Sequence, residues 1–532
     1  MKPYLLYRDQ TFSPQWGMIR TSATSAWWRD RDFKLQWEML PAEKRMVTQD
    51  LELDILFDAM ARGDKFLFEV AKNVVLSSVT DIDTIRYRQG VLGDCLKNPE
   101  AVRAMYAIAV ESIERHKKDF GWYSAQSPDS VRSTSIKGLE LFLEMLTGLR
   151  NTGVTHAAAF ESDGLRALVA MLETELSDEY FAGIRERLEE LRFPRGAQIR
   201  AELGEGNKGT GYALQRSQEV RKQGWMSRIF SRERPLQYSF TIHERDEAGF
   251  RALAELKGRG INTISNALAQ SSDHILAFFT ALKMELAFYI GCLNLYEQLA
   301  RMGDSVCFPV PCDPGSRALS YEGLYDACLA LKTEGRVVGN DADAGSTDLV
   351  IITGANRGGK STLLRSLGLA QVMMQCGLFA PAGSFRSDVC DGIFTHFKRE
   401  EDPTMRSGKF DEELGRMSEI VDLLTPNCMV LFNESFAATN EREGSEIARQ
   451  IVCALLERRV RVVFVTHLYE FARGLYEKKM ANAVFLRAER KPDGERTFRV
   501  VEGEPLQTSY GEDLYARIFS EPPPSPVPDD AI

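Results

Sequence analysis

Residues 350–362 read Val-Ile-Ile-Thr-Gly-Ala-Asn-Arg-Gly-Gly-Lys-Ser-Thr, and this stretch decides the fold of the second half of the chain. An apolar run stops at Gly354, and the spacing Gly354-x-x-x-x-Gly359-Lys360-Ser361 follows. In this motif the glycines let backbone N–H groups close around phosphate oxygens, the lysine reaches the β- and γ-phosphates, and the hydroxyl ligates Mg²⁺. A helix that starts at Ser361 aims its positive dipole end at the same phosphates. An accidental glycine-rich turn is the alternative, but strand, spacing, lysine and hydroxyl agree, and we predict a P-loop that binds a nucleoside triphosphate.

Two further apolar runs end in polar residues suited to the same site. One ends in Asn433 and Glu434, and the other in Thr466 and His467. In P-loop ATPases the first residue of the former pair holds Mg²⁺ through water, and the glutamate polarises the attacking water. Asn433 accepts a hydrogen bond but brings no charge. We predict that His467 senses the γ-phosphate; a histidine whose polar atoms are merely satisfied is the alternative.

Composition limits the class of protein. The 532 residues suggest about three or four domains, and 44% hydrophobic residues can build sizeable cores. A net charge of −10 argues against a broad nucleic-acid coat, though not against a local basic patch. The N-terminus lacks an apolar signal core, and the apolar stretch around 275–299 is interrupted by Lys283 and Glu285. We therefore expect no membrane span and a cytoplasmic or nucleoid-associated protein.

The predicted secondary structure changes near residue 349, from mostly helices to short strands that alternate with helices. Helical periodicity runs from Leu51 to about Gly148 and over 165–193, and a long helix is predicted from about Asp273 to Met302. Strands are predicted at 197–203, 237–243, 349–353, 429–432 and 460–466, and the last three alternate with helices as in a parallel sheet. We predict an α/β plus all-α chain with these parts: an N-terminal extension (1–50), a helical core and lever (51–305) with a clamp-like insertion near 197–243, a P-loop domain (306–520) and a disordered tail (521–532).

At this point the motifs resemble a known family. The segment Thr353–Thr362 resembles the Thr-Gly-Pro-Asn-Met-Gly-Gly-Lys-Ser-Thr of the MutS DNA mismatch-repair ATPases. Other elements follow in the order of that family: Val337–Asp341, Phe379–Pro381, Phe394–Asp402, Ser407–Leu414, Asn433–Glu434, Ser435–Asn440, Thr466–His467 and Ser509–Gly511. The resemblance is specific over about residues 330–515 and weaker over about 50–305. It implies a C-terminal ABC-type ATPase domain preceded by a helical MutS-like core with a lever helix.

The resemblance also implies the cofactors ATP and Mg²⁺ and a set of roles. Glu434 and His467 are catalytic, and Ser361 and Asn433 hold the metal. Nucleotide contacts fall on Gly354, Asn356, Gly358, Gly359, Lys360, Ser361, Thr362, Asn340, Ser407 and Gly408. In such families each ATP lies between the P-loop of one subunit and the signature of another, which implies a homodimer or a dimer with a homologue.

The departures from the family pattern matter as much. Ala355, Arg357 and Asn433 replace Pro, Met and Asp, and Gly408-Lys409 stands where the family has Ser-Thr. About fifty residues before the core are too few for a separate mismatch-reading domain. The family reads mismatches with a Phe-x-Glu pair. Phe142-Leu-Glu144 has this pattern, but it lies in an amphipathic stretch and indicates core packing. We therefore expect a short member that lacks the N-terminal mismatch-reading domain.

A basic stretch at 215–235 is the candidate DNA surface. A truncated clamp would place its cations on phosphates, with Trp225 or Phe230 as a stacking or wedging group. The cations are Arg216, Arg221, Lys222, Arg228, Arg232 and Arg234. The alternative is a solvated loop that offsets nearby acidic residues.

We interpret the chain as an ATP-gated dimeric clamp that acts in DNA mismatch repair or recombination on distorted or branched DNA. Two alternatives stay open: an ABC-type ATPase with a role outside DNA, and an ATP-binding scaffold with very weak hydrolysis, which Asn433 favours.

Overall fold

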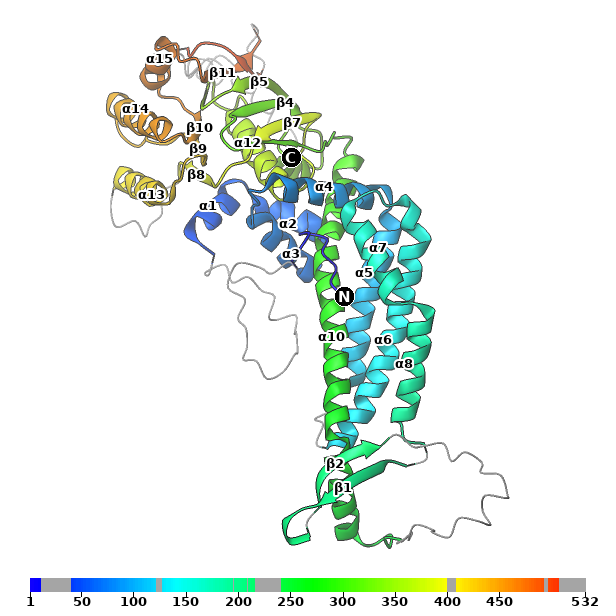
Figure 1. Ribbon diagram of the computed structural model, residues 1–532. Coiled ribbons are helices and arrows are strands. Elements are labelled where there is room, and N and C mark those ends of the chain that lie inside the picture. Colours follow the sequence, from blue (N-terminus) through cyan, green and yellow to red (C-terminus); the bar gives the residue numbers. More distant parts are fainter. Residues whose placement is uncertain are drawn as a thin grey trace, which may run out of the picture. The chain divides into compact units, whose positions relative to one another are not determined.

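The computed structural model describes residues 1–10, 40–120, 127–194, 196–207, 209–215, 241–399, 408–491 and 496–506 (Figure 1). The chain forms two compact units. Unit 1 comprises residues 1–3, 100–159 and 166–283, and unit 2 comprises residues 4–99, 160–165 and 284–532. The sequence-based boundaries at 50, 305 and 520 stay a prediction.

Unit 2 is built on a six-stranded sheet of order β12-β11-β6-β10-β9-β8. Its strands are β6 (Leu349–Thr353), β8 (Ile393–Phe397), β9 (Met429–Asn433), β10 (Arg461–Val465), β11 (Ala483–Arg490) and β12 (Arg496–Glu502). All pair in parallel except β12, which runs antiparallel at the edge. The predicted strands at 349–353, 429–432 and 460–466 and their parallel arrangement are confirmed.

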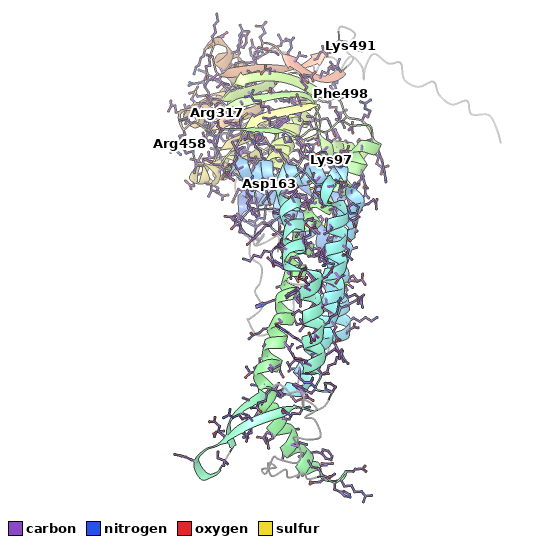
Figure 2. All side chains as sticks on the ribbon, turned by 45° about the vertical axis from the view of Figure 1, so that its right-hand side comes forward. Lys97, Asp163, Arg317, Arg458, Lys491 and Phe498 are labelled. Atoms are coloured by element: carbon purple, nitrogen blue, oxygen red, sulfur yellow. The ribbon has the colours of Figure 1, made fainter. Side chains whose placement is uncertain are left out.

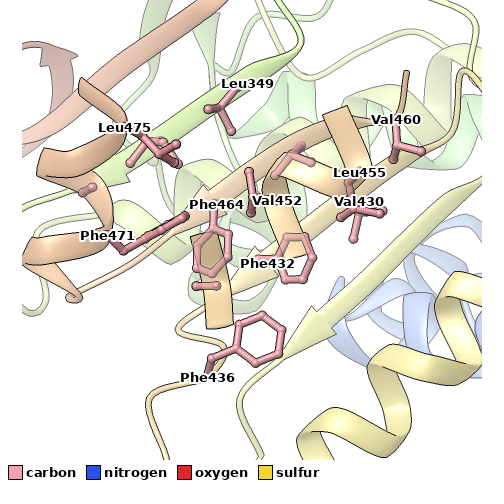
Figure 3. Close-up of a cluster of buried hydrophobic side chains, with 14 of the residues drawn as sticks. Leu349, Val430, Phe432, Phe436, Val452, Leu455, Val460, Phe464, Phe471 and Leu475 are labelled. Carbon is pink, nitrogen blue, oxygen red and sulfur yellow. The ribbon is translucent and has the colours of Figure 1, made fainter. Parts of the chain in front are cut away.

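Alternating side chains give this sheet two apolar faces. On one face Val430, Phe432 and Phe464 pack under helices, as Figure 3 shows. The rings of Phe432 and Phe464 stack 4.8 Å apart. The helices on this face are α13 (Lys409–Leu423), α14 (Glu441–Glu457) and α15 (Tyr469–Glu477). The other face carries α12 (Lys360–Gln375), whose Gly368 lets Leu431 approach closely. Because both faces are buried, the strands read as continuous apolar runs.

A second, four-stranded sheet of order β3-β7-β4-β5 adjoins the first within unit 2. It consists of β3 (Val310–Cys312), β4 (Ala318–Leu324), β5 (Asn340–Ser346) and β7 (Ser384–Asp388), and α11 (Ala327–Thr333) lies between β4 and β5 in the chain. Arg461 of β10 pairs with Asp388 of β7 at 2.7 Å, and both side chains are almost fully buried. Arg461 also donates to the carbonyl oxygens of Thr347 and Ala318, so a buried cation joins the two sheets.

Within the described residues 40–99 of unit 2, four helices precede these sheets, and two of them begin at a residue whose side chain caps the helix. They are α1 (Ala42–Asp50), α2 (Leu53–Ala61), α3 (Lys65–Leu76) and α4 (Ile82–Lys97). The side chains of Asp64 and Asp81 accept backbone N–H groups at the starts of α3 and α4.

An N-terminal strap, which we define as residues 4–8, is held by buried polar groups of unit 2. The Glu285 carboxylate accepts from the N–H groups of Leu5 and Leu6. Tyr289 donates its hydroxyl to the carbonyl of Leu5, and the fully buried Arg88 donates to that of Leu6. These contacts satisfy a backbone that would otherwise carry unpaired groups into the interior.

Unit 1 is mostly helical, with a β-hairpin between α8 and α10 in the chain. Its elements are α5 (Pro99–Phe120), α6 (Pro128–His156), η3 (Ala157–Ala159), α7 (Asp163–Glu175), α8 (Asp178–Leu191), β1 (Gln198–Leu203), η4 (Glu205–Asn207), β2 (Gly209–Gln215) and α10 (Glu247–Arg301), of which α5, α7 and α10 extend into unit 2. Phe142 is fully buried and stacks against His116 and Phe279, as core packing predicts.

The helical stretch predicted at 165–193 is confirmed and consists of two helices, α7 and α8; the Ser177 side chain accepts the N–H of Tyr180 and caps the start of α8 at Asp178. Two predictions for this unit need correction. β1 confirms the strand at 197–203, but its partner is β2; residues 241–243 form no strand, and 237–240 lie outside the described residues. The long helix begins at Glu247 rather than near Asp273.

Among the described residues one helix, α10, is long and apolar enough to cross a membrane by length and composition alone. In the structure 67% of its most apolar window is buried, as in the core helix of a soluble protein.

Candidate nucleotide-binding site

The predicted P-loop connects β6 to α12, as a phosphate-binding loop requires. Gly354 and Gly359 have φ angles of 114° and 93°, which favour glycine, and Arg357 adopts a φ of 58°. A side chain on Gly359 would place its Cβ 2.8 Å from the carbonyl oxygen of Phe498. The loop therefore needs its glycines both for its turn and for the close approach of a neighbouring strand.

Lys360 lies at the start of α12 and folds back over the loop. Its ammonium donates to the carbonyl oxygens of Gly354 at 2.9 Å and Ala355 at 3.0 Å. Burial lowers the pKa of Lys360 to about 8, although the Glu434 charge opposes the shift. A largely buried cation that donates to two neutral carbonyl oxygens is suited to transfer to an incoming phosphate, which would offer it full charges.

Ser361 and Asn433 form the predicted metal pair. The Ser361 hydroxyl donates to Oδ1 of Asn433 at 2.9 Å. These side chains place two oxygen atoms side by side, and Mg²⁺ prefers oxygen ligands completed by substrate phosphates and water. The donor set fits the metal, but Asn433 contributes no negative charge.

Glu434 and His467 contact each other beside this pair. Nε2 of His467 lies 2.9 Å from Oε1 of Glu434 and 3.3 Å from the Lys360 ammonium. One ring nitrogen cannot both donate to a carboxylate and accept from an ammonium. The hydrogen bond from His467 lowers the pKa of Glu434, against the raising effect of burial, so the carboxylate is ionised at neutral pH and Nε2–H donates to it.

The strands explain why these side chains converge. Asn433 ends β9, Glu434 follows it, and His467 follows β10, while the P-loop follows β6. Neighbouring parallel strands end at the same edge of the sheet, where ligands bind in α/β folds. The N–H of Glu434 donates to the carbonyl of Val465 at 2.9 Å, which fixes the carboxylate against β10.

Two hollows flank the converging side chains. One, of about 540 Å³, is lined by Ser361 and Asn433 on one side and by Asp50 and Glu412 on others. The second, of about 350 Å³, is lined by Gly354, His467 and neighbouring residues. The candidate site thus has open space beside Ser361 and Asn433 and, separately, beside Gly354 and His467.

Other predicted contacts have different surroundings. Oδ1 of the buried Asn340 accepts from the N–H of Val500 at 2.7 Å, so this amide oxygen already has a protein partner. Asn356 and Thr362 lie in the P-loop and at the start of α12. Gly408 precedes the first turn of α13. Ser407 and the six basic residues of the DNA prediction, Arg216, Arg221, Lys222, Arg228, Arg232 and Arg234, lie outside the described residues.

Sequence reasoning missed the contribution of β11 and β12. A Cβ at Gly354 or Gly358 would lie 2.9 or 2.8 Å from Cβ of Ala488, so β11 covers one side of the P-loop. The contact joins residues far apart in the chain, and the mixed-charge sequence of β11 gives no signal for it.

Comparisons with known proteins agree with this geometry. Residues 80–302 match the model of the MutS2 N-terminal domain, and residues 350–523 match that of MutS domain V. The chain is a member of the MutS-like family.

Similar curated proteins come from several bacteria. The chain is 31% identical to the DNA mismatch repair protein MutS of Clostridium kluyveri over 189 residues, which are 35% of this chain and 22% of that protein. It is 32% identical to MutS of Parasynechococcus marenigrum over 43% of this chain and 26% of that protein. It is 33% identical to Endonuclease MutS2 of Lacticaseibacillus casei over 41% of this chain and 28% of that protein. The matches thus span about a quarter of the length of these relatives.

Proposed function

We propose that this MutS-like chain is a Mg²⁺-dependent ATPase that binds DNA as an ATP-gated dimeric clamp. The supporting observation is the convergence of Lys360, Ser361, Glu434 and His467 at the carboxyl edge of one parallel sheet. The printed names of the relatives, a mismatch repair protein and an endonuclease, support a role in DNA mismatch repair or recombination.

Each side chain has a role in the proposed reaction. Lys360 leaves the carbonyls of Gly354 and Ala355 and compensates phosphate charge. Glu434 accepts the proton of the attacking water, and His467 holds the carboxylate and faces the γ-phosphate. Ser361 and Asn433 would hold Mg²⁺, which neutralises the charge that develops on the transferred phosphoryl group.

DNA binding and dimerisation rest on the family membership and on the basic stretch 215–235. We propose that Ser407 and Gly408 reach the ATP of a second subunit, and that distorted or branched duplexes are the preferred ligands. A homodimer and a dimer with a homologue are both compatible with this arrangement.

A second candidate, an ATP-binding scaffold with very weak hydrolysis, is favoured by one observation. Asn433 accepts the hydrogen bond from Ser361 as a carboxylate would, yet it adds no charge beside the metal position. Such a protein would bind nucleotide and use it as a latch.

One assay separates the candidates. ATP hydrolysis is measured with and without homoduplex, mismatched, branched and single-stranded DNA. Stimulation of hydrolysis by branched DNA supports the clamp, and tight ATP binding without turnover supports the scaffold. Turnover that no DNA changes supports an ABC-type ATPase with another role.

Lys360→Ala should weaken ATP binding at least tenfold, since charge-assisted contacts contribute roughly 1.5–3 kcal/mol. Unchanged affinity of this variant would remove the P-loop assignment.

A further inference from the structure

A buried histidine of unit 2 that has no role in the proposed reaction lies behind Glu434. His396 belongs to β8, which neighbours β9, and its fully buried ring stacks on Phe436 with the ring centroids 5.3 Å apart. Nδ1 of His396 lies 2.7 Å from Oγ of Ser435, and Nε2 lies 3.0 Å from the carbonyl oxygen of Glu413 in α13. The ring therefore bridges α13 and the residue that follows Glu434.

The hydrogen bonds around this ring cannot all form on a neutral imidazole. The Ser435 hydroxyl has one hydrogen and donates it to the carbonyl oxygen of His396, which is 2.5 Å away. Its contact with Nδ1 is then satisfied only if Nδ1 carries a hydrogen, and the Glu413 carbonyl is satisfied only if Nε2 carries one. A neutral ring has one hydrogen for its two nitrogens, so the three contacts together require the charged form.

The charged form of His396 is disfavoured in this position. Burial, and after it the charge of Arg416, lowers the pKa of His396 to about 4, so the ring is neutral at pH 7. Two arrangements are then available. With a hydrogen on Nε2, the ring donates to Glu413, and the Ser435 hydroxyl turns from the His396 carbonyl to Nδ1. With the hydrogen on Nδ1, the ring donates to Ser435, which keeps the His396 carbonyl, while the lone pair of Nε2 opposes the Glu413 carbonyl.

The backbone on both sides of Ser435 has a conformation that needs support. Glu434 and Phe436 have φ angles of 54° and 64°, which residues other than glycine rarely adopt. Strained backbone of this kind persists only where surrounding contacts fix it, and it is frequent at active sites. The N–H of Glu434 that donates to Val465 is one such contact, and the bonds between Ser435 and His396 are others. A change in the partner of the Ser435 hydroxyl therefore acts on the peptide that carries the Glu434 carboxylate.

We propose that His396 is a positioning residue that couples the place of α13 to the orientation of the Glu434 carboxylate, because its neutral ring satisfies either one of these two sides fully but not both. This inference rests on the proposed hydrolysis at Glu434. The helix α13 begins directly after Gly408. A ligand that contacts this start and shifts α13 against β8 would change the tautomer of His396 and, through Ser435, the activation of water.

Steady-state ATP hydrolysis by the full chain tests the positioning role. Ser435→Ala removes the hydroxyl and leaves the ring. It should lower kcat roughly fivefold, the effect of one hydrogen bond, and leave the KM for ATP within twofold of wild type. His396→Gln should give a similar loss, and the double variant should lose no more than the larger single loss, because the two side chains act as one unit. A wild-type kcat in Ser435→Ala, or fully additive losses, would overturn the proposal.

The tautomer of the ring is measured by nitrogen NMR of the chain with isotope-labelled histidine. The signals of His396 are those that His396→Gln lacks. At pH 7 the ring should be neutral, and its tautomer ratio should change when ATP and Mg²⁺ are added to Glu434→Gln, which is expected to bind ATP without hydrolysing it. A charged ring, or one fixed tautomer with and without ATP, would contradict the coupling.

Controls separate this result from loss of folding and from failure of the proposed function. His116, a half-buried histidine of unit 1, is the matched control, and His116→Gln should leave kcat unchanged. Arg458, which Figure 2 labels, follows α14 and is exposed, and Arg458→Ala should also leave kcat unchanged. If Glu434→Gln hydrolyses ATP at the wild-type rate, the proposed role of Glu434 fails. If Glu434→Gln loses turnover while Ser435→Ala keeps it, the role of His396 alone is refuted.

Discussion

Single side chains decide the chemistry of this site, and Lys360 is the clearest case. Its pKa of about 8 is lower than that of an ordinary lysine because burial disfavours the charged form. Phosphate binding needs that charge. The unliganded site therefore loses its main cation as the pH rises through about 8.

The affinity for ADP should consequently fall above pH 8, by up to about tenfold per pH unit, because binding then requires uptake of a proton. Calorimetry in two buffers of different ionisation enthalpy measures that uptake directly. Lys360→Arg, whose guanidinium stays charged, should show a flat profile over the same range. Proton uptake that persists in the arginine variant would assign the titration to another group.

The lowered pKa of Lys360 also makes the stability of the folded chain depend on pH. The folded chain releases the Lys360 proton near pH 8 and the unfolded chain near pH 10.4. Between these values the unfolded state binds more protons, so this group adds stability as the pH rises.

Glu434→Gln should keep nucleotide binding and reduce turnover about 10²- to 10⁴-fold. The amide can still accept the hydrogen bond of His467, but it cannot take a proton from water. Binding by calorimetry and phosphate release measure the two effects separately. A glutamine variant that hydrolyses ATP at the wild-type rate would place the base elsewhere.

Asn433→Asp should lower the Mg²⁺ concentration for half-maximal hydrolysis by roughly fivefold. Aspartate keeps the acceptor for Ser361 and adds a charge, and a charged contact contributes about 1 kcal/mol more than a neutral one. A Mg²⁺ titration of both proteins measures the change. An identical midpoint would indicate that the metal position is saturated without residue 433.

How well the site residues can be predicted from sequence alone depends on the strands and helices that carry them. The motif from Gly354 to Ser361 is local, and the runs before Asn433 and His467 are buried on both faces, so their elements were predicted from apolar runs. The strands β11 and β12 mix charged and apolar residues, and their contact with the P-loop glycines exists only in the folded chain. The first half of α10 was missed because Gly249, Gly258 and Gly260 weaken the helical signal there.

The strand β10 lies between β6 and β9, the strands that lead into the P-loop and Asn433. Phe464→Ala should destabilise unit 2 by roughly 3–5 kcal/mol, because the ring is fully buried and stacked on Phe432. Scanning calorimetry of both proteins is the measurement. Phe308→Ala should shift the same transition by less than about 0.5 kcal/mol. Equal effects of both variants would show that the sheet repacks around the lost ring.

We expect the whole molecule to bind DNA by contacting the phosphate backbone of the DNA and by recognising the shape of the duplex. Replacing Arg221, Lys222 and Arg228 together should flatten the log–log salt dependence of binding by roughly two to three units and weaken all duplexes alike. Filter binding or anisotropy over a range of salt measures the slope. A slope untouched by the triple substitution, or a hundredfold preference for a mismatch over homoduplex, would contradict backbone recognition.

The N-terminal strap, residues 4–8, can dock only after Glu285 has been synthesised. Leu5 meets Glu285 across 280 residues of sequence, and unit 1 lies almost entirely within that interval. At a translation rate of 5–20 residues per second, the strap waits about 15 to 55 seconds for its partner to be synthesised. Unit 1 can therefore fold on the ribosome before the strap docks. A fusion partner placed ahead of Met1 would stand directly before a segment whose partners Glu285 and Tyr289 are synthesised long after it.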